Sequence, residues 1–182
     1  MSQTSNDRDN LLAEEDKIAD AVLRALRALQ EPSGLPRLAE ALSMIPANGS
    51  HSSRLRIAIE LLNGSNEPLR VFWKTLPDYR YAGCNCSFAK DSGFTSVKQM
   101  IGLTDFDPKI SWNRQANKYR RDDEEVTRSG TFAPKVFERQ DRPEGTVWVH
   151  TAKAPLWVSG KIVGLLGMYE NIDEATARQR FS

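Results

Sequence analysis

Few side chains in this sequence are suited to nucleophilic or metal chemistry. Cys84 and Cys86 stand one residue apart, and the two histidines, His51 and His150, lie far from them along the chain. Cysteines this close together cannot join distant segments, so a disulfide framework is excluded. A zinc site would need further ligands, which only the histidines offer. We therefore predict no metal site and interpret both cysteines as small core or pocket-lining residues.

No sequence signature of an enzyme is present. The chain has no Gly-rich phosphate loop, no His-Glu-x-x-His and no Gly-x-Ser-x-Gly motif. The phosphoacceptor and ATP-binding regions of histidine kinases and the GGDEF motif of cyclases are absent as well. We predict that the chain is not an enzyme, and the rival hypothesis is an enzyme that uses Cys84 or Cys86.

Composition and charge restrict the class of protein. Of the 182 residues, 40% are hydrophobic and 27% are charged, which is typical of a globular domain. The net charge is +1, from 25 Lys and Arg against 24 Asp and Glu, so electrostatics do not favour nucleic acid or an anionic membrane as a partner. No apolar run approaches the roughly 18 residues of a membrane span, and the polar N-terminus is not a signal peptide. We expect a cytoplasmic protein with reduced thiols.

Residues 1–66 are predicted to be a helical extension. One apolar stripe runs along the first segment, at helical spacing: Leu11, Ile18, Val22, Leu26 and Leu29. A break at 31–34 precedes a second helix over 35–45, and a third helix is expected over 52–63.

The periodicity changes after residue 66. Segments 69–74 and 79–83 predict a β-hairpin, and segments 132–140, 146–153 and 161–170 predict three more strands. Between them, residues 85–129 are predicted to form short helices and loops, with a longer helix over 111–129. The last strand is almost continuously apolar, which indicates a central strand covered on both faces.

Six segments carry a family resemblance when they are taken in order. They are ValPheTrpLys (71–74), TyrArgTyrAlaGlyCysAsnCysSerPheAla (79–89), MetIleGlyLeuThrAspPheAsp (100–107), the helix 112–126 with its Ala-x-x-Tyr-Arg-x-Asp-Asp-x-x-Val pattern, GluArgGln (138–140) with TrpValHisThrAlaLysAlaProLeu (148–156), and 160–172. Together they resemble a PAS domain. The resemblance covers roughly 67–174, and residues 175–182 would begin an output helix.

The resemblance implies an α/β protein of the α+β type. We expect a five-stranded antiparallel sheet with short helices on one face, preceded by the N-terminal helices. Such domains often enclose a small pocket and serve as sensory or regulatory modules of bacterial signal transduction, such as two-component systems. The implied partners are a small-molecule ligand and an output domain in the same or another chain.

The expected pocket is aromatic. The candidate ligand-pocket residues are Cys86, Phe88, Phe106, Trp112, Tyr119, Trp148 and Lys153, joined by Tyr169. The alternative is that these side chains fill the core and leave no open pocket. Glu138 and Lys153, on neighbouring predicted strands, are interpreted as a structural cross-strand pair. The acidic run 122–125 is interpreted as a solvated helix face.

No cofactor is predicted, although haem and flavin are the alternatives. The segment AsnCysSerPhe (85–88) is similar to the AsnCysArgPhe motif of flavin-binding light sensors, but it lies one element too early. The equivalent place is held by residues 102–107, which contain no cysteine. Haem-binding relatives usually use a ligand on the long helix, and segment 111–129 has no His, Cys or Met. His150 faces either the pocket or the outside.

We expect a homodimer built largely by the N-terminal helices. Burying each side chain of the apolar stripe is worth about 1.5–3 kcal/mol, so the stripe must be covered. It can fold back on the sheet or pair with a second copy, and three helices exceed the needs of one sheet face. An alternative is a transcription regulator, because 35–44 and 52–61 faintly resemble a helix-turn-helix. Their connection is longer than the usual turn of about 3–4 residues, and nucleic acid is not an expected partner.

Overall fold

The computed structural model describes residues 3–64 and 68–181. Three helices open the chain: α1 (Gln3–Ser33), α2 (Pro36–Ser43) and α3 (His51–Asn63). Their places agree with the three helices expected from the sequence. The predicted boundary between the helical extension and the sensor domain, at residue 66, lies outside the described residues.

The sheet has five antiparallel strands in the order β2-β1-β5-β4-β3. They are β1 (Arg70–Thr75), β2 (Arg80–Cys84), β3 (Ala133–Arg142), β4 (Gly145–Val158) and β5 (Lys161–Ile172). The predicted fold class is therefore confirmed, and so is the central position of strand 161–170. β4 is longer than expected and continues to Val158 before a turn.

Short helices follow the β1–β2 hairpin. α4 (Cys86–Asp91) begins at Asn85, whose side chain accepts a hydrogen bond from the backbone N–H of Phe88. The long helix, α5 (Ala116–Ser129), starts later than predicted because Asn113–Gln115 form a 3-10 turn. It ends at Gly130, whose φ of 68° is the left-handed conformation that glycine adopts at little cost. The chain ends in α6 (Glu174–Phe181).

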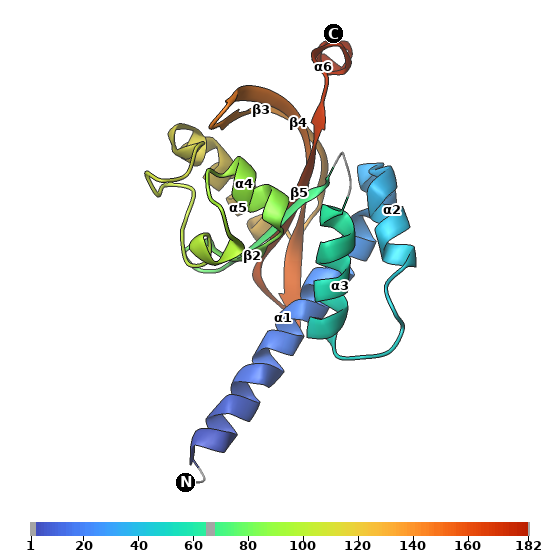
Figure 1. Cartoon of the computed structure of the whole chain (residues 1–182), viewed down its shortest axis with the longest axis vertical. Coiled ribbons are helices and arrows are strands. Elements are labelled where there is room, and N and C mark those ends of the chain that lie inside the picture. Colours follow the sequence, from blue (N-terminus) through green and yellow to red (C-terminus); the bar gives the residue numbers. More distant parts are fainter. Residues whose placement is uncertain (1–2, 65–67, 182) are drawn as a thin grey trace.

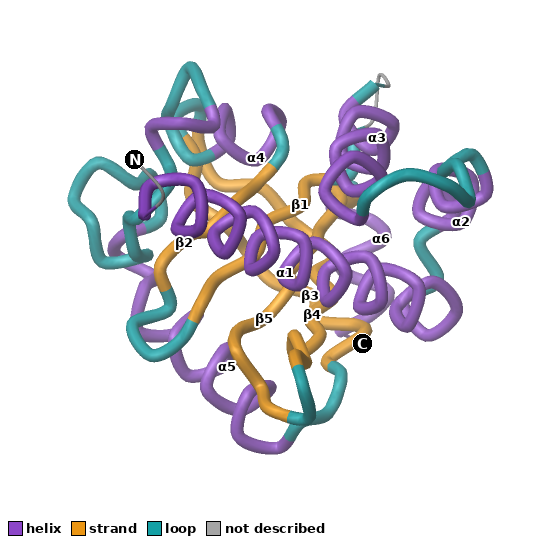
Figure 2. Tube along the Cα trace, turned by 90° about the horizontal axis from the view of Figure 1, so that it is seen from below, coloured by secondary structure: helices purple, strands orange, loops and turns teal. Residues whose placement is uncertain are grey.

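The helices lie on opposite faces of the sheet (Figure 1). We call the face covered by α1 the outer face and the face covered by α4 and α5 the inner face. Figure 2 shows α1 running across the strands, with α2 and α3 beside it. None of the described helices is long and apolar enough to cross a membrane.

The outer face of the sheet buries most of the apolar stripe of α1. Val22, Leu26 and Leu29 are fully buried against side chains of β1, β4 and β5, namely Val71, Ala152, Ala154, Leu156, Leu166 and Met168. The expectation that a second copy covers this stripe is therefore wrong for its C-terminal part, because the chain's own sheet offers an apolar surface. Leu11 differs, because it is 61% exposed. The N-terminal part of α1 projects from the rest of the molecule (Figure 1).

The inner face holds a second, aromatic core. Phe72, Tyr81, Phe88, Trp112, Tyr119 and Tyr169 pack there between the sheet and the helices. The ring of Phe72 lies where a Cβ atom on Gly167 would come within 2.1 Å, so only glycine fits in β5 at this point. The close approach at this glycine is made by an aromatic ring of the neighbouring strand β1.

Candidate functional site

Two lysines project from the sheet into the inner core. On β1, Lys74 alternates with Val71 and Trp73 and so shares the inner face with Phe72; on β4, Lys153 shares it with Thr151. Both lysines are fully buried, at 1% and 2% exposure. A buried ammonium group requires a carboxylate partner, which here comes from α5.

Asp123 joins the two lysines. Its Oδ2 lies 2.6 Å from Lys74 Nζ and its Oδ1 lies 2.6 Å from Lys153 Nζ, and its side chain is completely buried. Asp123 follows Tyr119 by one helical turn on the buried side of α5. One carboxylate therefore connects α5 to both β1 and β4.

Asp105 is the second carboxylate of this cluster. Its Oδ2 lies 2.5 Å from Lys74 Nζ, while its Oδ1 accepts hydrogen bonds from the hydroxyl of Tyr81 at 2.5 Å and from Trp112 Nε1 at 3.2 Å. The Lys74 ammonium also lies 4.8 Å from the centre of the Tyr81 ring, a cation–π contact.

Glu138, on β3, closes the cluster towards the edge of the sheet. Its Oε1 accepts a hydrogen bond from Thr151 Oγ1 at 3.0 Å, and its Oε2 lies 2.5 Å from Lys118 Nζ. The Glu138 side chain is 4% exposed, whereas that of Lys118, on α5, is 44% exposed. We refer to Lys74, Asp105, Asp123, Lys153, Glu138 and Lys118 as the inner charge cluster.

The electrostatics of the cluster favour its charged form. Burial acts to raise the pKa of Asp123, but Lys153 and Lys74 outweigh it and hold that pKa below its ordinary value. Burial acts to lower the pKa of Lys153, but Asp123 and Glu138 raise it above its ordinary value. Burial and Asp105 raise the pKa of Tyr81, so this hydroxyl stays protonated and donates.

A small cavity of about 20 Å³ lies among these groups. Its wall combines aromatic rings with polar groups of the inner charge cluster: Phe72, Lys74, Tyr81, Phe88, Asp105, Trp112, Tyr119, Glu138, Gln140, Thr151, Lys153 and Tyr169. A water molecule needs roughly 10–15 Å³, so the space matches about one water. An aromatic wall with a few convergent polar groups is typical of small-molecule sites.

Several residues predicted from the sequence meet at this cavity. Phe88, Trp112, Tyr119 and Lys153 line it, as does Tyr169. Glu138 and Lys153 both line it too, but they do not form the expected direct pair. In the β3–β4 register Glu138 lies opposite Val149, not Lys153, so Lys153 binds Asp123 and Glu138 binds Lys118 instead.

Three predicted pocket residues lie elsewhere. Trp148 projects from the outer face, because the alternation of β4 sends Val149 and Thr151 inward, and it lies beside Arg139. Phe106 is 46% exposed, since its loop turns Asp105 inward instead. Cys86 is exposed at the start of α4, where the buried position belongs to Phe88.

Sequence reasoning missed the three charged residues at the centre of the site, Lys74, Asp105 and Asp123. Asp123 belongs to the acidic run interpreted as a solvated face, and that interpretation is wrong for this residue, which is fully buried. The sequence did contain an indication of them: each of two apolar strands carries a lysine at an inward position. A buried lysine requires an acidic partner on the element that faces it.

The histidines and cysteines considered for haem or flavin chemistry are not among the described residues that line the cavity. α5 carries no His, Cys or Met, and His150 lies on the outer face, stacked on Phe137. Burial raises the pKa of the Cys84 thiol to about 12, which suppresses the reactive thiolate. Among the described residues, no group of three or more His, Cys, Asp or Glu is arranged to hold a metal ion.

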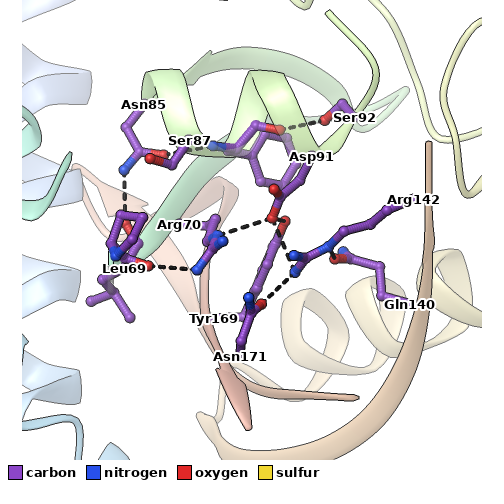
Figure 3. Close-up of polar contacts among 12 residues, drawn as sticks. Leu69, Arg70, Asn85, Ser87, Asp91, Ser92, Gln140, Arg142, Tyr169 and Asn171 are labelled. Carbon is purple, nitrogen blue, oxygen red and sulfur yellow. Dashed lines mark hydrogen bonds and ion pairs between the residues drawn. The ribbon is translucent and has the colours of Figure 1, made fainter. Parts of the chain in front are cut away.

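A second polar cluster, centred on Asp91, fixes α4 to the sheet (Figure 3). Asp91 Oδ2 lies 2.9 Å from Arg70 Nε and 3.0 Å from Arg142 Nη2, and it accepts a hydrogen bond from the hydroxyl of Tyr169. These partners come from β1, β3 and β5. Burial lowers the pKa of Arg142 although Asp91 opposes this shift. The cluster supports one wall of the cavity, because Tyr169 lines it.

Comparison with solved structures finds the same fold at low sequence identity. VqmA of Vibrio cholerae, in a complex with ligand and DNA, matches with a TM-score of 0.54 and 22% identity over 69% of this chain and 53% of that chain. A phage VqmA–DPO complex matches with a TM-score of 0.52 and 17% identity, over 71% and 57%. A PAS domain from Colwellia psychrerythraea matches with a TM-score of 0.51 and 14% identity, over 65% and 96%.

The VqmA structures extend well beyond this chain, which spans about half of their length, 53% in the DNA complex. No curated protein sequence matches the chain. The family model for the PAS fold, however, matches residues 62–177, and this range holds the five strands and the whole inner charge cluster. The chain therefore belongs to the PAS family.

Proposed function

We propose that this chain is a cytoplasmic sensory or regulatory module that binds a small organic molecule at the inner cavity. The relay of that binding to an output domain, in the same or another chain, belongs to the same proposal. The observation that carries it is the inner charge cluster, which places four fully buried charges around an aromatic cavity.

Stability alone does not explain such a cluster. Replacing a buried ion pair by apolar side chains is often neutral or stabilising, so buried charges are weak devices for holding a fold together. Perturbed charged groups gathered at a cavity are instead typical of functional sites. A non-enzymatic role agrees with the high pKa of Cys84, the buried candidate nucleophile.

The size of the cavity makes binding a conformational event. A ligand larger than one water enters only if α5 or the side chains of the wall move, because the cavity measures about 20 Å³. α5 is attached to β1 and β4 through Asp123. A ligand that accepts a hydrogen bond from Lys153 competes with Asp123 and so changes how α5 sits on the sheet.

A thermal-shift screen with a library of small polar aromatic compounds tests this proposal. We expect at least one compound to raise the Tm of the wild-type chain, with an affinity at least tenfold weaker in Lys153→Met. Lys161→Met, at an exposed lysine of the neighbouring strand, is the matched control and should bind as the wild type does. Failure of the whole library, or equal binding by Lys153→Met, would overturn the proposal.

We also propose that the module is a homodimer joined through the projecting part of α1. Leu11 and Leu12 are 61% and 54% exposed. An apolar groove of about 570 Å³ begins further along α1, at Glu14 and Glu15, and is lined among others by Ile18, Ala19, Leu55, Ile59, Trp73 and Ala82. Ile18 follows Leu11 by two helical turns, so the groove continues the face that carries Leu11, and a two-fold pair of α1 helices buries both.

Light scattering tests the dimer. The wild-type chain should have the mass of two copies, and Leu11→Glu with Leu12→Glu should halve that mass while the chain stays folded, with an unchanged far-UV circular dichroism spectrum. Its Tm should no longer depend on protein concentration. Asp7→Ala, at an exposed position of the same helix, is the control. A wild-type monomer, or a dimer that survives both substitutions, would contradict the proposal. Removing residues 1–65 is unsuitable because α1 covers the outer core.

DNA binding is not part of the proposal. Residues 44–50, which join α2 to α3, are more than the usual turn of about 3–4 residues. Leu38 of α2 and Leu55 of α3 are buried with α1 in the outer core, so both helices use their apolar faces to pack inside the chain.

A further inference from the structure

One ion pair of the inner charge cluster differs from the rest in its access to solvent. Lys74, Asp105, Asp123 and Lys153 are all buried and pair with one another. Glu138 is equally buried, yet its cationic partner is Lys118, whose side chain is 44% exposed. The charge of this one inner carboxylate is therefore balanced by a side chain that reaches in from the surface.

The balance of charge inside the cavity depends on that lysine. The cavity wall carries two cations, Lys74 and Lys153, and two carboxylates, those of Asp105 and Glu138. Behind the wall, the carboxylate of Asp123 binds both lysines, so the cluster holds two cations against three carboxylates before Lys118 is counted. The ammonium of Lys118 brings the sum to zero. Because an uncompensated buried charge is costly, any ligand that displaces Lys118 must itself bring a positive charge, and an anionic ligand would leave the interior negative.

The place where Lys118 enters is a seam between α5 and the edge strand β3, closed by polar side chains. Gln115 Nε2 donates to the carbonyl of Arg139 at 3.1 Å, and Gln115 Oε1 accepts from the N–H of Asp141 at 2.9 Å. The Lys118 ammonium lies 5.6 Å from the centre of the Tyr119 ring, and this ring lines the cavity. An aromatic face and a carboxylate together are the recognition elements for an organic cation.

We propose that Lys118 occupies, in the unliganded chain, a cation site that a small organic ammonium compound takes over when it binds. Glu138 and Thr151 receive the ammonium group, Tyr119 provides a ring face, and Lys118 moves out into solvent. This inference rests on the proposed sensory function, since it names the chemical class of the ligand for the same cavity.

Chemical rescue of Lys118→Ala tests the site directly. The substitution removes the equivalent of propylammonium and leaves Glu138 without a cation. We expect a Tm several degrees below wild type, with at least half of the loss restored by propylammonium chloride in a saturable manner. Sodium chloride and propan-1-ol, which match the salt and the carbon chain, should restore none of it.

The double variant Lys118→Ala with Glu138→Gln is the matched control, because it no longer needs a cation. Propylammonium should not raise its Tm. An equal rise in both variants, or no amine-specific rise in Lys118→Ala, would overturn the proposal. If Lys118→Ala yields no folded protein, it is refolded in propylammonium chloride or in sodium chloride: folding only with the amine supports the site, and equal recovery or none overturns it.

The rescue and the library screen fail independently. A neutral or anionic compound that binds the wild type at this cavity, with no rescue of Lys118→Ala, would keep the sensor and overturn the cation site. Rescue without a library ligand would support the cation site and count against the sensor.

Discussion

The two faces of the sheet use the same strands in opposite ways. Towards α1, β4 presents Ala152 and Ala154; towards α5, the intervening residue of the same strand is Lys153. β1 repeats the contrast, with Val71 outward and Lys74 inward. The outer face is an apolar surface with a helix packed on it, whereas the inner face holds charges that require partners from other elements.

Under the proposed function, this difference assigns stability mainly to the outer face and ligand binding to the inner face. Each apolar side chain buried in the outer core stabilises the folded state, and no charged group is needed there. The inner core places charges where their desolvation is unfavourable, and it keeps a cavity beside them. We infer that α1 on the outer face holds the fold, while α5 on the inner face is the element that responds.

The largest effect is expected from Asp123→Ala. It leaves Lys153 and Lys74 competing for the remaining carboxylates in a buried site, and breaking such a pair costs about 3–5 kcal/mol. Urea unfolding should show this loss of stability. Glu124→Ala, one residue along α5 and exposed, should change stability by less than about 0.5 kcal/mol. If Asp123→Ala lowers the free energy of unfolding by as little as Glu124→Ala does, the buried charges of the inner face are not needed for stability, and the contrast between the two faces is wrong.

Leu26→Ala probes the outer face. Leu26 is fully buried between α1 and the sheet, and truncating a buried leucine costs about 2–5 kcal/mol. Ligand affinity at the inner cavity should stay unchanged once the protein is folded. Arg27→Ala, at an exposed position of the same helix, serves as control and should change stability by less than about 0.5 kcal/mol. Ligand affinity that falls with Leu26→Ala would show that the two faces are coupled.

The pH dependence of stability should come from the inner face. The pKa of Asp123 is lowered in the folded chain, so its contribution is complete above the ordinary value of 3.8 and is lost as the pH falls through the folded value. The pKa of Lys153 is raised, so its contribution is complete below 10.5 and is lost as the pH rises through the folded value. Urea midpoints measured from pH 3 to 11 should therefore fall at both extremes.

Asp123→Asn is the control for this experiment. It should be less stable at neutral pH and should show a weaker fall on acidification, because one titrating group has been removed. If the urea midpoint of Asp123→Asn falls on acidification as steeply as that of the wild type, other carboxylates cause the loss of stability at low pH.

The smallest effect concerns the two thiols. Burial raises the pKa of Cys84 to about 12, whereas Cys86 is exposed. Titration of the native chain with a thiol reagent at pH 8 should modify one thiol quickly, and Cys86→Ser should abolish that fast phase. A fast reaction that persists in Cys86→Ser would indicate that the inner core opens, and it would revive Cys84 as a candidate nucleophile.

Prediction from sequence was most accurate for segments whose apolar pattern allows only one kind of burial. The apolar run at 161–170 required cover on both faces, and β5 is indeed the central strand. Phe88, Trp112 and Tyr119 were placed at the cavity because aromatic side chains on the covering helices face the sheet. Trp148 was predicted at the same pocket but lies on the outer face, because period-two alternation leaves two possible faces and the strand's register decides between them.

Charge was harder to interpret than apolar pattern. An acidic run such as 122–125 gives no indication of which carboxylate turns inward, because that depends on the rotation of α5 against the sheet. The same holds for the expected pair of Glu138 and Lys153, which required a register that β3 and β4 do not adopt. The apolar stripe of α1 was recognised, but its partner was not, since helix spacing shows only that a face is buried.

Local periodicity and short motifs along the chain predicted the order of the elements and the PAS family. Which charges meet depends on tertiary structure. Lys74, Asp105, Asp123 and Lys153 come from four separate segments, and their ion pairs exist because strand register and helix rotation bring Nζ and Oδ atoms within 2.6 Å of each other. The attraction between opposite charges weakens as their separation grows, and sequence spacing does not determine that separation.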